Sequence, residues 1–392
     1  MLPSVTNQKN KLGLYVHWPF CLSKCPYCDF NSHNQKDVDV KQWQIAYISE
    51  LRWMAEIYKQ KAECPAKLRS VFFGGGTPTL MPTRIIEEIL DTLTELFEID
   101  PEIEITAEAN PSSSEIEKLS AFKSAGVNRV SLGAQSLNKN TLKFLGRGHD
   151  VDDIYKALEA AFGLFEKVSA DFIYGIPNQS VKTWQDELAQ ILCLGLSHIS
   201  AYQLTIEPGT QFFTRSKKGE ILTCNENIMT DLYKLTTNLL SENGYELYEI
   251  SNYARPDFHC QHNLIYWNAQ DWIGIGPGAH GRFSISGNRR WHSQMRRSPD
   301  GWLSAIQKNL HGVEIQNEDN ETEFAKEIIL MGLRLSSGIY LPDWLFKNAN
   351  YLNSFWLDQF ETDGLIITKK NHICVTENGR LHLNSIIDRL LN

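Results

Sequence analysis

Cys21-Leu22-Ser23-Lys24-Cys25-Pro26-Tyr27-Cys28 is the most informative segment for inferring the fold of this chain. It places three thiols within eight residues at C-x3-C-x2-C spacing, and so many thiols in one short segment cannot all serve a hydrophobic core. The spacing wraps the segment around one small inorganic group. Cubane iron–sulfur clusters normally take four cysteine thiolates. Three ligands at this spacing would leave one iron open to a small molecule.

The alternatives are a zinc site completed by a nearby group such as His33, or a chance grouping of cysteines. Zinc sites usually place their ligands as separated C-x2-4-C or H-x3-5-H pairs, and no second pair follows here. We therefore favour the cluster over zinc.

The triplet follows a strand-like run at residues 12–18, and in that context it resembles the radical S-adenosylmethionine (SAM) superfamily. The resemblance implies a [4Fe–4S] cluster on Cys21, Cys25 and Cys28. It also implies that the open iron is chelated by the amino and carboxylate groups of SAM.

Length and composition limit the function. The 392 residues suffice for a barrel of about 250 residues and a further domain. A net charge of −9 disfavours a nucleic-acid partner, which usually meets a basic face. No apolar leader opens the chain, and no run approaches the roughly 20 apolar residues of a membrane-spanning helix. Eight cysteines, scattered apart from the triplet, suit a reducing compartment. We expect a cytoplasmic protein, monomer or homodimer, whose only membrane contact would be peripheral.

The first two hundred residues alternate between strand-like and helix-like segments. We expect strands at 12–18, 70–73, 102–107, 129–132, 168–173 and 198–204, and helices at 40–58, 83–97, 114–124, 152–165 and 184–194. Such alternation implies a parallel sheet with right-handed crossovers. The predicted fold is α/β, with an incomplete (β/α)6 radical-SAM barrel, open on one side.

Polar and glycine-rich segments fall where these strands end, and that rim carries the active site in barrels of this class. The candidates are Cys21, Cys25, Cys28, Gly74-Gly75-Gly76-Thr77-Pro78-Thr79, Glu108, Gln135 and Asp171. The glycines let a ligand approach the backbone, and N–H groups at a strand-to-helix turn favour an anion such as a carboxylate. Turns and solvated charges would explain any one of these positions, but explain the set poorly.

The alternation fades after residue 207, where we expect a helix at 225–240 and a strand at 245–250. Two motifs follow, His259-Cys260-Gln261-His262-Asn263-Leu264-Ile265-Tyr266-Trp267 and a glycine-rich run at 271–281. Imidazole, thiol and large aromatic groups suit a metal-bearing macrocycle. A buried histidine in an aromatic core is the alternative.

In the C-terminal residues we expect helices at 321–335 and 341–360, a hairpin at 364–367 and 372–376, and a final helix at 381–391. This order indicates a small α+β, winged-helix-like C-terminal domain that serves packing or protein contact. We divide the chain into the barrel core (1–210), a barrel extension carrying H-N-x-x-Y-W (211–310) and the C-terminal domain (311–392).

Motifs over nearly the whole chain resemble the group that contains the oxygen-independent coproporphyrinogen III oxidases. They are 15–21, 74–79, 108–111, 135–136, 145–147 and 171–177. Within that group, 28–33, 202–208 and 262–267 resemble the HemW heme chaperones. This chain departs from the oxidases at two points. They carry a fourth cysteine two residues after the third, whereas this chain has Phe30 there. They also have a longer segment before the first strand, whereas only fourteen residues precede Tyr15 here.

The resemblance implies the roles of the site residues. Tyr15, Gly75, Gly76 and Thr77 would hold SAM near the cluster, and Glu108, Gln135, Arg147 and Asp171 would complete its site. His262 would bind heme, with Cys260 as a second candidate ligand.

A heme chaperone is therefore expected, with heme, heme-donor proteins and heme-acceptor proteins, some in the respiratory chain, as partners. An anaerobic coproporphyrinogen oxidase is the alternative. A radical-SAM enzyme acting on another substrate, such as RNA, fits the acidic charge least.

Overall fold

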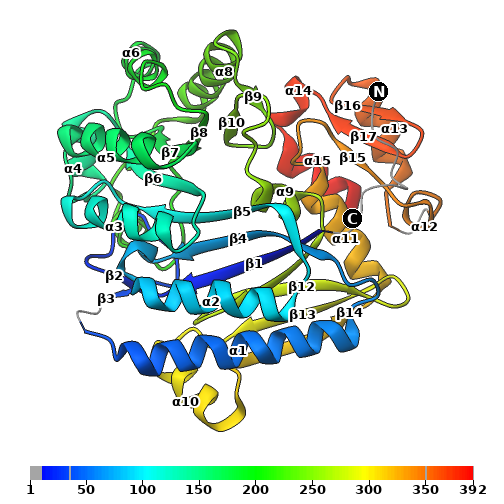
Figure 1. The fold of residues 1–392 in the computed structure, drawn as a ribbon. Helices are drawn as coiled ribbons and strands as arrows, with labels where there is room; N and C mark the ends of the chain where they lie inside the picture. Colours follow the sequence, from blue (N-terminus) through cyan, green and yellow to red (C-terminus); the bar gives the residue numbers. More distant parts are fainter. Residues whose placement is uncertain (1–10, 35–36, 349–350, 392) are drawn as a thin grey trace.

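The computed structural model is built on one curved sheet, whose strands are drawn as arrows in Figure 1. The structure describes residues 11–34, 37–348 and 351–391. In this part of the chain the sheet has twelve strands in the order β14-β13-β12-β11-β1-β4-β5-β6-β7-β8-β10-β9. No helix in the described segments is both long and apolar enough to cross a membrane.

Seven neighbouring strands of this sheet run parallel, beginning with β11 (Asp271–Ile275). The other six form the predicted barrel. They are β1 (Lys11–Trp18), β4 (Lys67–Gly75), β5 (Ile99–Ala109), β6 (Arg129–Gln135), β7 (Lys167–Tyr174) and β8 (His198–Gln203). On its far side β8 pairs with β10, and β1 pairs with β11, so β1 and β8 do not meet. The expected incomplete (β/α)6 barrel is confirmed.

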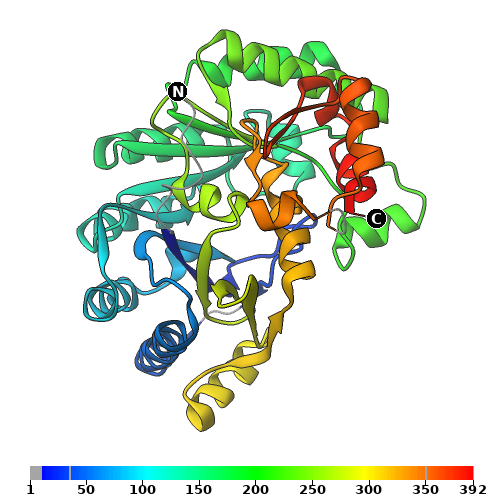
Figure 2. The ribbon, with the colours of Figure 1, turned by 90° about the vertical axis from the view of Figure 1, so that its right-hand side faces the viewer.

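The helices that connect these strands cover the outer side of the curved sheet, as Figure 2 shows. They are α1 (Val40–Lys61), α2 (Thr83–Leu96), α3 (Ser113–Ser124), α4 (Lys139–Phe144), α5 (Val151–Leu164) and α6 (Val181–Leu192). Their apolar faces meet the sheet at helical spacing. In α2, for example, Ile85, Ile86 and Ile89 are all fully buried.

The segment after the barrel extends the sheet at both edges. It contains α7 (Gln211–Lys217), α8 (Glu226–Glu242), β9 (Glu246–Leu247), β10 (Asn252–Ala254), α9 (Gln261–Trp267), β11 (Asp271–Ile275), β12 (His280–Ile285), β13 (Arg289–Met295), α10 (Pro299–Asn309) and β14 (Val313–Asp319). The single strand expected at 245–250 is wrong, because β9 and β10 are two short antiparallel strands. The division at 210 and 310 stays a prediction. The sheet itself continues to Asp319.

The C-terminal part has its own apolar core. Its elements are α11 (Glu321–Gly332), β15 (Ile339–Tyr340), α12 (Asp343–Phe346), α13 (Ser354–Thr362), β16 (Ile366–Lys369), β17 (His372–Val375), α14 (Glu377–Arg380) and α15 (Leu383–Leu391). Helix, strand, two helices and a hairpin is the winged-helix order. The continuous helix expected at 341–360 is wrong, since Pro342 and Asn353 begin two separate helices. Glu327 joins this part to the sheet through ion pairs to Arg282 (2.9 Å) and Arg290 (3.3 Å).

Candidate functional site

Cys21 ends β2 (Phe20–Cys21), and Cys25 and Cys28 lie on the loop from β2 to β3 (His33–Asn34). These two short strands pair in parallel just beyond β1. His17 on β1 bonds to this loop, with its Nε2 2.9 Å from the carbonyl oxygen of Asn31. Burial raises the pKa of the Cys21 and Cys28 thiols. A positively charged metal group would have to compensate for their deprotonation.

The loop forms one wall of a cavity of about 610 Å³ at the carboxyl ends of the barrel strands. Ten of the residues assigned to the cluster or to SAM from the sequence line this cavity. They are Cys21, Cys25, Cys28, Gly75, Gly76, Thr77, Glu108, Gln135, Arg147 and Asp171. The strands gather them because parallel strands end at the same rim.

Gly75 and Gly76 shape the cavity floor between β1 and β4. Gly75 has φ +114°, and a Cβ there would lie 2.7 Å from the carbonyl oxygen of Trp18. A Cβ on Gly76 would lie 2.6 Å from the carbonyl oxygen of Phe20. The absence of side chains therefore lets this turn pack closely against the backbone of residues 18–20. Both glycines also line the cavity.

Two carboxyl groups line the cavity, Glu108 on β5 and Asp171 on β7, the strands on either side of β6. Desolvation, together with the charge of Asp171, raises the pKa of Glu108 to about 8. Burial also raises the pKa of Asp171, although the Ser131 hydroxyl donates to it at 3.3 Å. The amide of Gly75 donates to Glu108 Oε2 at 3.3 Å. A pair of partly charged carboxyls in one cavity suits a ligand with a cationic group or hydroxyl donors.

Arg147 joins the cysteine loop to the barrel rim. Its guanidinium donates to Cys25 Sγ at 3.3 Å, to the carbonyl of Gly133 at 3.1 Å and to the side chain of Asn110. It also lies 3.5 Å from the hydroxyl of Tyr27. Sequence reasoning did not assign Asn110 or Tyr27 to the site, although both stand within the motifs that marked it.

Gln135 ends β6 in the left-handed region, with φ +67°. A residue other than glycine in this region costs on the order of 1 kcal/mol or more and is held there by its surroundings. The register of β6 and β7 shifts between Leu132 and Gln135, which turns the last residues of the strand toward the rim. This irregularity aims Gln135 at the cavity.

Tyr15 does not line the cavity but lies in the aromatic layer beneath it. Its hydroxyl bonds to His17 Nδ1 at 3.0 Å, and its ring stacks on Phe72 at 6.3 Å between centroids. The charge of Glu108 is near enough to help raise the pKa of Tyr15, after burial. Tyr15 therefore supports the cavity floor in this structure, and its contact with SAM stays a prediction.

His262 lies deeper still, on α9, inside the barrel. Its Nδ1 bonds to the Ser70 hydroxyl at 2.8 Å and its Nε2 to the Tyr266 hydroxyl at 2.9 Å. The ring stacks on Phe72 with centroids 5.0 Å apart and is 1% exposed. Burial lowers its pKa to about 3, so the imidazole is neutral. Both ring nitrogens are thus engaged in this conformation, and the role of His262 as a heme ligand stays a prediction.

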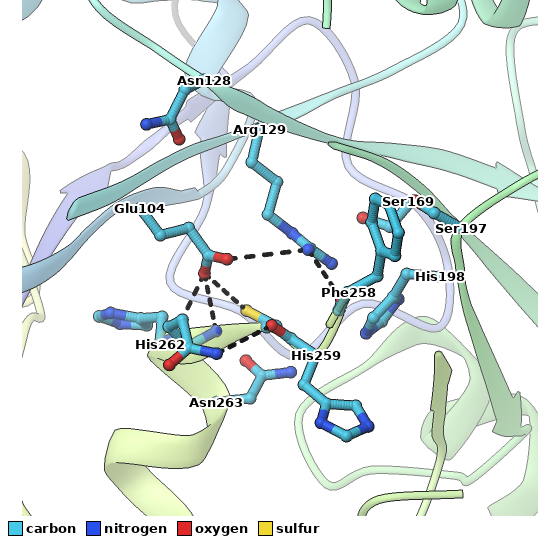
Figure 3. Close-up of polar contacts among 12 residues, drawn as sticks. Glu104, Asn128, Arg129, Ser169, Ser197, His198, Phe258, His259, His262 and Asn263 are labelled. Carbon is cyan, nitrogen blue, oxygen red and sulfur yellow. Dashed lines mark hydrogen bonds and ion pairs between the residues drawn. The ribbon is translucent and has the colours of Figure 1, made fainter. Parts of the chain in front are cut away.

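Cys260 is buried just before α9, where its Sγ approaches Glu104 Oε1 at 3.5 Å. Burial raises the pKa of its thiol to about 12, so it is a neutral thiol near neutral pH. Figure 3 shows Glu104 between Arg129 and the N-terminus of α9, with His262 beside it.

The cysteine loop fits a cluster better than a single ion. A structural zinc site would need a fourth ligand beside the three cysteines. His33, the candidate fourth zinc ligand, has its Nε2 3.3 Å from Asn31 Oδ1. The three cysteines that line this cavity could ligate an iron–sulfur cluster, and the carboxyl groups across the cavity could bind a small organic ligand.

An open six-stranded barrel with three cysteines at its mouth defines a radical-SAM protein, and the comparisons agree. Residues 15–191 match the model of the Radical SAM superfamily. The heme chaperone HemW of Haemophilus influenzae is 33% identical over 97% of this chain and 98% of its own. The mitochondrial radical S-adenosyl methionine domain-containing protein 1 of Danio rerio is 35% identical over 97% of this chain and 86% of its own. The chain belongs to the HemW family.

Among solved structures, the coproporphyrinogen III oxidase HemN of Escherichia coli, a radical-SAM enzyme, superimposes with a TM-score of 0.80. It is 22% identical and matches 97% of this chain and 90% of its own. At this identity the likeness establishes a shared fold across both the barrel and the C-terminal part.

Proposed function

We propose that this chain is a heme chaperone, which binds heme and passes it to an acceptor hemoprotein while carrying a SAM-liganded [4Fe–4S] cluster. The observation that carries the proposal is the match, at 32–33% identity over 97% of the chain, to relatives named as heme chaperones. The cavity supports it, because its residues suit both the cluster and SAM.

The cavity residues divide between these two groups. Cys21, Cys25 and Cys28 would ligate the cluster. The backbone at Gly75, Gly76 and Thr77 would lie along SAM, and Arg147 would pair with its carboxylate. Glu108, Gln135 and Asp171 would receive its amino group and ribose hydroxyls. When bound, the cluster supplies one-electron chemistry to SAM, and the protein supplies orientation and charge.

The alternative is an oxygen-independent coproporphyrinogen III oxidase. Phe30 stands where those enzymes carry a fourth cysteine, and its side chain is 55% exposed beside the cavity. The likeness to the Escherichia coli oxidase extends to the fold alone at 22% identity. Both observations favour the chaperone.

Heme itself is assigned to the H-N-x-x-Y-W segment, with His262 as the ligand and Cys260 as the alternative. The neutral imidazole of His262 is the form that binds heme iron. The protonated thiol of Cys260 would first have to lose its proton. His262 is therefore the better ligand of the two.

The partners follow from this role. Acceptors would be hemoproteins, among them those of the respiratory chain, with a separate protein as heme donor. The charge of −9 argues against nucleic acid. Eight free thiols suit a reducing compartment such as the cytoplasm. We propose a monomer or a homodimer, with membrane contact only at the periphery.

Heme transfer tests the proposal. The chain is loaded with one equivalent of heme and mixed with an apo-hemoprotein, and the Soret spectrum is followed over time. The proposal predicts that the acceptor spectrum appears at a rate that rises with acceptor concentration. A rate that stays at that of spontaneous heme release would contradict it.

A further inference from the structure

A buried ion pair between two barrel strands hydrogen-bonds to the backbone of residues 258–262, the segment that carries His262. Glu104 on β5 and Arg129 on β6 have side chains 0% and 2% exposed, with Glu104 Oε2 3.8 Å from Arg129 Nη1. Figure 3 shows both side chains directed at the residues around the start of α9. We call them the Glu104–Arg129 pair.

Each member of the pair holds the backbone of this segment. Glu104 Oε1 accepts the amide of Gln261 at 2.8 Å and that of His262 at 3.4 Å. Arg129 donates to the carbonyl of Phe258 at 3.2 Å. The charge on each side chain strengthens these bonds relative to neutral ones. The residues on both sides of Cys260 are thus fixed to the barrel wall.

In the conformation of α9 that this pair stabilises, His262 cannot bind the iron of heme. Ser70 and Tyr266 occupy its two nitrogens, and Phe72 stacks on one face of the ring. Tyr266 is itself packed edge-on against Trp272, with centroids 4.8 Å apart. Heme can reach Nε2 only if the Tyr266 hydroxyl parts from it and the start of α9 moves away from the barrel.

We propose that the Glu104–Arg129 pair is a positioning element. It holds His262 in the buried conformation that heme cannot reach, and so sets the apparent affinity for heme. This inference rests on the proposed function. Apparent affinity falls with the fraction of molecules in the competent state, since Kd,app equals the intrinsic Kd divided by that fraction. Weakening the pair should therefore tighten heme binding, the reverse of what loss of a merely structural contact would do.

The first variant is Glu104→Gln, which keeps an acceptor oxygen but removes the charge and leaves Arg129 without its ionic partner. Tyr266→Phe is the second, because it frees Nε2 and leaves the pair intact. Glu50→Gln is the matched control. Glu50 is also fully buried and accepts backbone amides, from Gly276 and Gly312, both at 2.7 Å, but it lies in a different part of the sheet.

Heme titration of the full chain without cluster, followed by the Soret band, gives Kd for each variant. The inference predicts a Kd at least about fivefold lower for Glu104→Gln and for Tyr266→Phe, and an unchanged Kd for Glu50→Gln. Hydrogen exchange of residues 258–267 should quicken in Glu104→Gln alone. An unchanged or higher Kd in a folded Glu104→Gln variant would overturn the inference, whatever the Kd of Tyr266→Phe.

The two proposals fail in different ways. A His262→Ala variant with wild-type Kd and spectrum would remove His262 from heme binding and overturn the ligand assignment. Exchange at residues 258–267 would still report on the pair. Wild-type exchange in a folded Glu104→Gln variant would show that the pair does not hold α9, whatever heme does.

Discussion

The guanidinium of Arg147 lies 3.3 Å from the sulfur of Cys25, so a fixed positive charge adjoins a proposed cluster ligand. The same side chain donates to Asn110 and to the carbonyl of Gly133, and it lines the cavity, where it could pair with the carboxylate of SAM. One residue therefore serves both the cluster loop and the ligand cavity.

Replacing Arg147 by Lys should weaken SAM binding about tenfold or more. Lysine keeps the charge but loses the planar fork that contacts three partners at once, and a lost charged hydrogen bond is worth about 1.5–3 kcal/mol. Calorimetric titration of the cluster-loaded chain with SAM measures the effect. Arg215→Lys, at an exposed ion pair, is the control. Equal SAM affinity in the two variants would refute the assignment of Arg147.

Replacing Cys25 by Ser should abolish the cluster, because three cysteines are the fewest that hold a cubane with one open iron. Iron and sulfide analysis after anaerobic reconstitution measures it, together with the visible absorption of the cluster. Cys193→Ser changes an exposed free thiol and should leave the cluster content as it is. A full cluster in Cys25→Ser would argue against this ligand set.

Replacing Gly75 by Ala should destabilise the chain by about 1–3 kcal/mol and impair SAM binding. The reason is a φ of +114° together with a Cβ 2.7 Å from the Trp18 carbonyl oxygen. Gly163→Ala in α5 is the control, since a Cβ there meets nothing within 4 Å and should slightly stabilise the helix. Urea unfolding compares the two, and the account fails if they do not differ.

Replacing Glu108 by Gln should change the pH dependence of stability. Burial raises the pKa of Glu108 from 4.5 to about 8, so between these values the folded chain holds a proton that the unfolded chain has lost. The stability this proton contributes is lost as pH rises toward 8, by at most about 1.4 kcal/mol per unit. Glu108→Gln should match wild type near pH 4.5 and exceed it increasingly up to pH 8.5 in denaturant titrations. Parallel profiles would contradict the raised pKa.

The barrel was predictable because its signals are local. Each strand is a short apolar run that ends in a glycine, a proline or a polar residue, and each helix has its own apolar stripe. The strand order beyond the barrel was not predictable, since β11 pairs with β1 across more than two hundred residues. The broken helix at 341–360 was missed because its apolar spacing continues through the capping residues Pro342 and Asn353.

The site divides in the same way. Motifs at strand ends led to the cavity, because parallel strands bring those ends together whatever the details of packing. The depth of Tyr15 and His262 could not be read from the sequence. The partner of His262 Nδ1 is Ser70, 192 residues earlier in the chain, and no spacing rule connects them. Glu104 was likewise hidden, as it reads only as one polar position within a strand.

The central claim is that this chain carries heme and does not consume its porphyrin precursor. The most direct measurement is an anaerobic assay of the reconstituted chain with coproporphyrinogen III and SAM, run beside a heme titration. The account predicts tight heme binding and no loss of carboxyl groups from coproporphyrinogen III. Conversion of coproporphyrinogen III to protoporphyrinogen would contradict it and would make the chain an oxidase.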